Sequence, residues 1–143
     1  MTEFRRVTAA FSVAPQLVAE DIARAAEEGF RTIICNRPDG EAPGQLTCEE
    51  AQRLTEAAGM TFHFAPFVGA PPPAVVEQTE AWLTQAPGPI LAYCRSGTRS
   101  ITVWALAQAL AGALTPDEIL EKAAEAGYDL SMARMALRGL YPG

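Results

Sequence analysis

One cysteine of this chain stands in a setting that would make it a nucleophile. Cys94 comes directly after the apolar run 89–93 and before the segment RSGTRS (residues 95–100), which combines glycine, two arginines and hydroxyl residues. A helical stretch follows, so loop amides and the positive end of a helix would surround the sulfur. Such surroundings favour the thiolate, which is the form that attacks electrophiles at neutral pH. The sequence therefore predicts nucleophilic chemistry at Cys94.

The composition predicts one folded domain that handles a small anion. The chain has 143 residues, of which 49% are apolar and 20% are charged, and its net charge is −6. Residues 1–143 are the length of a single domain. The acidic balance argues against nucleic acid as a partner. No apolar run reaches the roughly 18–20 residues of a spanning helix, so no membrane partner is expected. The two loop arginines stand out as a local positive spot.

The cysteines and the N-terminus predict a reducing, cytoplasmic setting. Cys35, Cys48 and Cys94 have spacings that match no zinc pattern, so neither a metal nor another cofactor is expected. The first residues lead into no apolar signal core. In a reducing compartment Cys94 stays a free thiol.

Strand and helix patterns alternate along the chain. Expected strands cover 9–13, 32–35, 60–64 and 89–93, and expected helices cover 19–28, 47–59, 74–85, 100–111, 116–126 and 131–140. Thr47 with Glu50, and Thr115 with Glu118, have the spacing of helix capping boxes. The alternation predicts an α/β domain of three layers, with a mostly parallel central sheet and helices on both faces. Loops 36–41 and 65–69 should then meet the Cys94 loop at the carboxyl edge of the sheet.

Two segments of the chain resemble known families. AEDIARAAEEGFRTIICNRPDGE (residues 19–41) resembles the dual-specificity branch of protein tyrosine phosphatases, and YCRSGTRS (93–100) resembles rhodanese-type sulfurtransferases. Together the pattern is similar to the phosphatase-like domain family of β-lactamase hydrolase-like proteins. The resemblance implies a tyrosine-phosphatase-like fold of the dual-specificity type, since only helices follow the cysteine loop. The family name also suggests a persulfide-oxidising enzyme of metallo-β-lactamase fold as a partner.

Two departures from the phosphatase pattern favour sulfur transfer. The phosphatases that the chain resembles place an arginine after Cys and five further residues, whereas here that position is Ser100 and the arginine is Arg99. They also protonate the leaving oxygen with an aspartate on a loop before the cysteine, and this chain has no aspartate between residues 39 and 117. Such a general acid contributes about 10²–10⁴-fold to the rate. Sulfite or a thiolate leaves without a proton.

We therefore expect a cysteine-dependent, rhodanese-like sulfurtransferase. Cys94 would take sulfane sulfur from thiosulfate or a low-molecular-weight persulfide, hold it as a persulfide and pass it to a thiol acceptor. Arg95 and Arg99 would bind the anionic donor, and Ser100 would donate a hydrogen bond to the Cys94 sulfur. The other expected substrate-binding residues are Ser96, Gly97, Thr98, Arg37 and Asp39. Two alternatives stay open: a tyrosine or dual-specificity-like phosphatase that forms a phosphocysteine on Cys94, and a non-catalytic anion-binding module.

Four side chains near this edge have roles that the sequence leaves open. Arg37 and Asp39 form either a structural ion pair or turn lock, or part of the substrate site, and Asp39 would replace the missing general acid if its loop covered the cysteine. Cys35 either packs in the core or resolves a Cys94 persulfide as a disulfide. His63 is the only histidine and alternates with phenylalanines along a strand, which favours a structural role.

Overall fold

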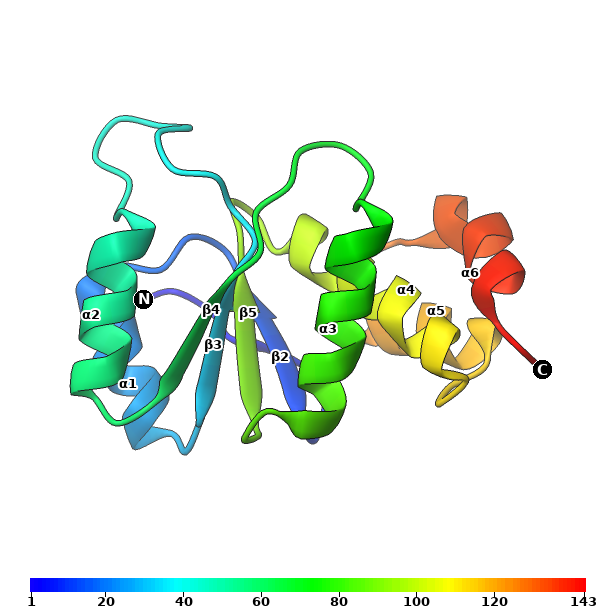
Figure 1. The fold of residues 1–143 in the computed structure, drawn as a ribbon, viewed down its shortest axis with the longest axis horizontal. Coiled ribbons are helices and arrows are strands. Elements are labelled where there is room, and N and C mark those ends of the chain that lie inside the picture. Colours follow the sequence, from blue (N-terminus) through cyan, green and yellow to red (C-terminus); the bar gives the residue numbers. More distant parts are fainter.

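Five short strands form one sheet that separates two layers of helices (Figure 1). The structure is a computed structural model that describes residues 1–143. The strands are β1 (Arg5–Thr8), β2 (Phe11–Ala14), β3 (Thr32–Cys35), β4 (Thr61–Phe64) and β5 (Ile90–Tyr93). The helices are α1 (Ala19–Glu27), α2 (Cys48–Ala57), α3 (Pro73–Gln85), α4 (Thr98–Ala111), α5 (Pro116–Glu125), the short 3₁₀ helix η1 (Ser131–Ala133) and α6 (Arg134–Leu140). Helices α1 and α2 cover one face and α3 to α6 lie on the other, as expected for three layers. None of these helices has the length and apolarity needed to cross a membrane.

The sheet is mostly parallel, with one antiparallel edge. The strand order is β1-β2-β5-β3-β4; β2, β5, β3 and β4 run parallel, and β1 pairs antiparallel with β2. The sequence predicted a single first strand over residues 9–13. The structure instead has two strands, β1 and β2, which are joined by a turn at residues 9–10. Strand β1 lies at the edge and buries only Val7, so it lacks the apolar alternation that reveals a strand in sequence.

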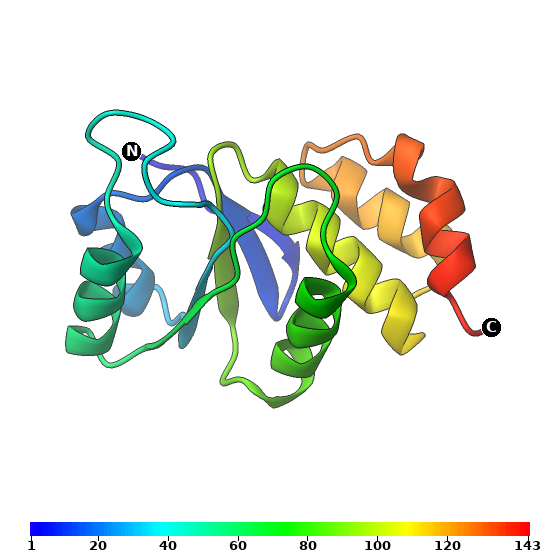
Figure 2. The same cartoon turned by 45° about the horizontal axis from the view of Figure 1, so that its top comes forward.

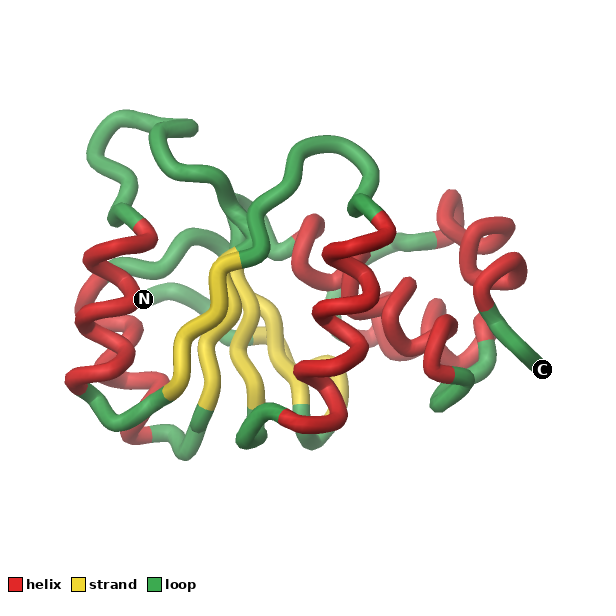
Figure 3. The backbone as a smooth tube through the Cα atoms, viewed as in Figure 1, coloured by secondary structure: helices red, strands yellow, loops and turns green.

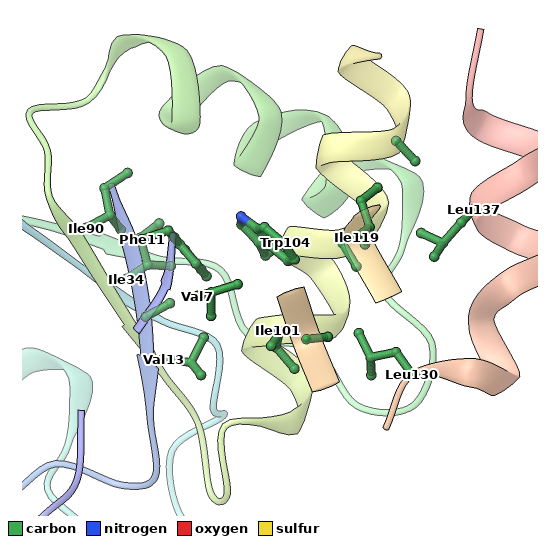
Figure 4. Packing of buried hydrophobic residues seen from close by; sticks show 14 residues of the cluster. Val7, Phe11, Val13, Ile34, Ile90, Ile101, Trp104, Ile119, Leu130 and Leu137 are labelled. Carbon is green, nitrogen blue, oxygen red and sulfur yellow. The ribbon is translucent and has the colours of Figure 1, made fainter. Parts of the chain in front are cut away.

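The central strand β5 is buried on both faces, which fixes the position of the cysteine that follows it. Ile90 and Ala92 belong to the cluster beneath α4, and Leu91 and Tyr93 belong to the cluster beneath α1 and α2. In the first cluster Phe11 stacks on Trp104 of α4, with ring centroids 5.8 Å apart and 14° between the planes (Figure 4). Burial on both faces is typical of strands in a parallel sheet. The end of β5 is thus held in place by packing on both faces of the sheet.

The helix ends agree with the sequence in part. Thr115 and Glu118 form the predicted capping box: the Thr115 amide donates to Glu118 Oε1 over 2.9 Å and the Glu118 amide to Thr115 Oγ1 over 3.2 Å. At Thr47 only half of the predicted box forms, because the Glu50 carboxylate pairs with Arg53 instead. The single helix expected over 131–140 is divided into η1 and α6.

The loops that follow β3, β4 and β5 gather at one edge of the sheet, as the alternation predicted. Figures 2 and 3 show the first two rising on the same side of the sheet. The Asn36 side-chain amide donates to the Ala65 carbonyl over 2.9 Å, and Arg99 Nη1 donates to the Phe67 carbonyl over 3.2 Å. These contacts join three segments that lie far apart in the chain.

Candidate active site

Cys94 lies at the base of the loop between β5 and α4, where a backbone amide contacts its sulfur. The residue is 1% exposed, and the Gly97 N–H donates to Cys94 Sγ over 3.1 Å. Gly97 has a φ of +95° and precedes the first residue of α4. That left-handed conformation, which favours glycine, turns the chain from strand to helix within three residues of Cys94.

Arg99 extends from the first turn of α4 to the neighbouring loops. Its Nη1 and Nη2 lie 3.0 and 2.7 Å from the two carboxylate oxygens of Glu41. The hydrogen bond to the Glu41 carboxylate raises the pKa of Arg99, and the nearby Cys94 acts in the same direction. Arg99 is therefore a fixed positive charge at the pocket, and its anion-binding role stays a prediction.

Glu41 connects two arginines, and the sequence analysis did not single it out. Besides Arg99 it accepts a hydrogen bond from Arg37 Nε over 2.8 Å, and Arg37 Nη1 donates to Gln16 Oε1 over 3.0 Å. The two guanidinium groups hold the pKa of Glu41 at about 2, so its carboxylate is ionised at neutral pH. The i, i+4 spacing of Arg37 and Glu41 was the only local signal for this contact.

Of the structural roles open to Arg37 and Asp39, the ion pair between them is wrong, because each side chain has another partner. Arg37 is buried and pairs with Glu41, whereas Asp39 Oδ1 accepts the backbone N–H of Cys48 over 2.8 Å at the start of α2. A carboxylate satisfies the unpaired amides at a helix start, which explains its place there. Asp39 thus serves the adjoining helix, and this arrangement does not support its expected substrate-binding role or a role as a substitute general acid.

A shallow pocket of about 360 Å³ opens beside the cysteine loop. Its lining residues are Glu41, Val68, Gly69, Arg95 and Arg99. Arg95 and the apolar side chain of Val68 are exposed. The only carboxylate in the lining is that of Glu41, which is ionised and occupied by arginines. The pocket lining therefore carries two arginines, one of them already paired with Glu41, and no protonated carboxyl group.

The hydroxyl of Ser100 has a different partner from the one expected. It donates to Asn36 Oδ1 over 2.9 Å, whereas the sequence predicted that it donates to the Cys94 sulfur. Asn36 in turn donates to the Ala65 carbonyl. Both side chains are fully buried, so each polar atom needs a partner, and Asn36 supplies one where β3 ends. Ser100 thus joins three loops instead of contacting the nucleophile.

Two further loop residues contact each other at the surface. Ser96 and Thr98 are exposed, and the Ser96 hydroxyl donates to Thr98 Oγ1 over 3.0 Å. On the side of the C-terminal helices the Tyr128 hydroxyl donates to the Ser96 carbonyl over 2.9 Å. No local pattern could have indicated Tyr128, because it reaches the loop from the turn that follows α5.

Cys35, Cys48 and His63, like Cys94 itself, are not among the residues that line the pocket. Cys48 Sγ donates to Cys35 Sγ over 3.3 Å, and this hydrogen bond lowers the pKa of Cys35 and raises that of Cys48. The partner of Cys35 is therefore the Cys48 thiol, not the sulfur of Cys94. His63 stacks on Trp82 with ring centroids 4.4 Å apart, and partial burial lowers its pKa. This contact agrees with a structural role.

Comparison with known proteins places the chain beside phosphatase-like relatives. Residues 3–111 match the family described as the phosphatase-like domain of β-lactamase hydrolase-like proteins. A β-lactamase hydrolase-like protein of Agrobacterium fabrum is 33% identical over 132 residues, which are 90% of this chain and 30% of that protein. The chain thus spans less than a third of the length of the curated relatives it matches.

Solved structures of the same fold agree with the predicted class. A candidate phosphatase from Neisseria meningitidis Z2491 is 35% identical, with a TM-score of 0.81 over 94% of this chain and 96% of that one. PTPMT1, solved in complex with PI(5)P, has a TM-score of 0.76 over 96% of this chain and 93% of that one. At 17% identity its likeness is one of fold alone. The tyrosine-phosphatase-like fold expected from the sequence is confirmed.

Proposed function

Because the chain belongs to the family of phosphatase-like domains of β-lactamase hydrolase-like proteins, we propose that it is a phosphatase that acts through a phosphocysteine on Cys94. The observation that carries the proposal is the Gly97 amide on the Cys94 thiol at the base of the loop, together with the charged Arg99, which lines the adjoining pocket. The family and the related structures support this alternative better than sulfur transfer, which the loop pattern favoured.

The reaction has two displacement steps. The Cys94 thiolate attacks phosphorus, an S–P bond forms, the P–O bond breaks, and the leaving oxygen departs with the electron pair. Water then attacks the phosphocysteine, which releases dihydrogen phosphate and restores the thiolate. Arg99 and the loop amides stabilise the charge on the transferring group in both steps.

The substrate class follows from the lack of a proton donor. Asp39 is bound to the start of α2, and Glu41 is ionised between two arginines. A general acid is worth about 10²–10⁴-fold when the leaving oxygen is basic. We therefore assign to the site phosphate compounds whose leaving group is stable as an anion, such as aryl phosphates, acyl phosphates and phosphoanhydrides.

Sulfur transfer remains the second candidate, and the size of the loop favours it. Arg99 comes one position earlier than in the phosphatase pattern, so the cradle is smaller and suits a single sulfur atom. In this reaction the Cys94 thiolate attacks the outer sulfur of thiosulfate, an S–S bond forms, and sulfite leaves with the electron pair. The resulting persulfide then passes its sulfur to a thiol acceptor. Sulfite needs no general acid either.

A leaving-group series tests the proposal. Hydrolysis rates are measured for aryl phosphates whose phenols range from acidic to weakly acidic, with wild type, Cys94→Ser and, as a cysteine change outside the pocket, Cys48→Ala. Rates should fall steeply as the phenol becomes less acidic, vanish in Cys94→Ser and persist in Cys48→Ala. The contrary result is a protein that hydrolyses no member of the series through Cys94 but turns over thiosulfate in the presence of cyanide. That result would identify the protein as a sulfurtransferase and not a phosphatase.

A further inference from the structure

One peptide unit of the cysteine loop is hydrogen-bonded at both ends. Its carbonyl, that of Ser96, accepts the Tyr128 hydroxyl over 2.9 Å, and its N–H, that of Gly97, donates to Cys94 Sγ over 3.1 Å. The phenol, the peptide and the sulfur thus form one continuous chain of donors and acceptors. We propose that Tyr128 is a positioning residue that orients this peptide toward Cys94 and so stabilises its thiolate.

The physical effect follows from the polarity of the peptide group. A donor at the carbonyl oxygen draws electron density through the amide and makes its N–H more positive. Hydrogen bonds in such chains strengthen one another by about 10–30% per bond. The Tyr128 hydroxyl also restrains rotation of the peptide, which would turn the Gly97 N–H away from the sulfur. Both effects favour the charged form of the thiol over the neutral form.

Tyr128 is held firmly enough to act in this way. Its backbone N–H donates to the Ala123 carbonyl over 2.9 Å, and Leu130, two residues later, is buried in the core cluster (Figure 4). The guanidinium of Arg5 in β1 lies over its ring, 5.2 Å from the centroid. Burial raises the pKa of Tyr128, so the hydroxyl keeps the proton that it donates.

The space above the loop fits the phenol closely. A Cβ atom at Gly97 would overlap the Tyr128 hydroxyl oxygen and lie 3.0 Å from Cζ. Tyr128 and the glycine are therefore matched to each other. Because Tyr128 lies beyond residues 3–111, the helices that follow the family match supply part of the site.

The charged and titratable groups around this chain of hydrogen bonds come from the cysteine loop itself, which carries Arg95, and from three other elements. Arg99 of α4 acts on Cys94 and is itself paired with Glu41 of the loop after β3. Arg5 of β1, with Glu3 just before it, faces Tyr128. The substitution Tyr128→Phe removes the hydroxyl and keeps all five groups, so a change in Cys94 reactivity reports the hydrogen bond.

The test compares Cys94 alkylation by iodoacetamide between pH 5 and 10 in wild type, Tyr128→Phe and Tyr141→Phe. Peptide mass spectrometry resolves the three cysteines. A net hydrogen bond changes an equilibrium by about two- to tenfold, so Tyr128→Phe should react that much more slowly at low pH and shift the profile midpoint upward. The rates should converge at high pH, and Tyr141→Phe, which alters a tyrosine outside the loop, should follow wild type.

A second measurement keeps the proposal testable if Tyr128→Phe is less stable than wild type. The Gly97 amide proton resonance of glycine-labelled protein should move upfield in Tyr128→Phe, because its hydrogen bond to sulfur weakens, and stay in place in Tyr141→Phe. Superimposable alkylation profiles of wild type and Tyr128→Phe would overturn the proposal, as would equal shifts in both variants. The proposal rests on Cys94 being the nucleophile of the proposed function, but alkylation needs no phosphate substrate, so the two can fail separately.

Discussion

The carboxylate of Glu41 binds the guanidinium of Arg99 at two points, with N–O distances of 2.7 and 3.0 Å between residues 58 positions apart. Both side chains line the pocket beside Cys94. An anionic substrate that needs Arg99 must therefore share the guanidinium with Glu41 or displace it. The geometry makes Glu41 both a support for Arg99 and an internal competitor of the substrate.

Glu41→Gln should tighten the binding of inorganic phosphate. The substitution keeps an amide oxygen for Arg99 but removes a negative charge beside the anion. A unit charge at contact distance is worth about 1 kcal/mol in bulk water and more at a protein surface, so the gain in affinity should be about fivefold at the least. Calorimetric titration with phosphate measures the change, and Glu49→Gln on the exposed side of α2 is the control. If Glu41→Gln binds phosphate more weakly than wild type and the control does not, then Glu41 helps more by positioning Arg99 than it hinders by competing with phosphate.

The same residue predicts a pH dependence of stability. The arginines lower the pKa of Glu41 from 4.5 to about 2, so the folded state favours the ionised form. The stabilisation is therefore present in full above pH 4.5 and is lost as the pH falls toward 2. Melting temperatures of wild type and Glu41→Gln should differ most at pH 6, and the gap should narrow by pH 3. A gap that stays constant over this range would contradict the assigned ion pairs.

Ser100→Ala should lower the stability of the fold and leave the reactivity of the Cys94 thiol nearly unchanged. Its hydroxyl donates to the fully buried Asn36, and its removal leaves that acceptor unpaired at a cost of about 1–3 kcal/mol. Urea unfolding measures the loss, with the exposed Ser131→Ala as the control. The pH profile of Cys94 alkylation should match that of wild type. A shifted profile would instead support the hydrogen bond from Ser100 to the Cys94 sulfur that the sequence predicted.

Gly97→Ala should cost more than backbone strain alone. Gly97 and Gly29 have nearly equal φ angles of +95° and +97°, but a Cβ meets the Tyr128 hydroxyl at Gly97 and nothing within 4 Å at Gly29. A left-handed conformation costs a non-glycine residue about 1–2 kcal/mol, which Gly29→Ala should show in full. Gly97→Ala should lose more free energy of unfolding and also most of its Cys94-dependent hydrolysis. Equal losses of stability in the two variants would show that the Tyr128 side chain moves away from the added Cβ without a cost in free energy.

The parts of the site that the sequence predicted are those set by local patterns. The buried run before Cys94 and the glycine-containing loop after it specify a strand, a turn and a helix start, and the alternation of elements brings the three loops to one edge. Strand β1 was missed because an edge strand that buries only Val7 has little apolar pattern. The partners of Arg99, Ser100 and Ser96 come from distant segments, so only the folded chain shows that they are Glu41, Asn36 and Tyr128.

Direct trapping of the intermediate tests the central claim, that Cys94 is the nucleophile of a phosphatase. Wild type and Cys94→Ser are mixed with an aryl phosphate that has an acidic phenol, quenched within milliseconds, and digested for mass spectrometry of the Cys94 peptide. The account predicts a phosphoryl group on Cys94 that forms with the release of phenol, decays as phosphate appears and is absent from the variant. An unmodified Cys94 at every time, in protein that gains one cyanide-labile sulfur at Cys94 from thiosulfate, would contradict it and assign the loop to sulfur transfer.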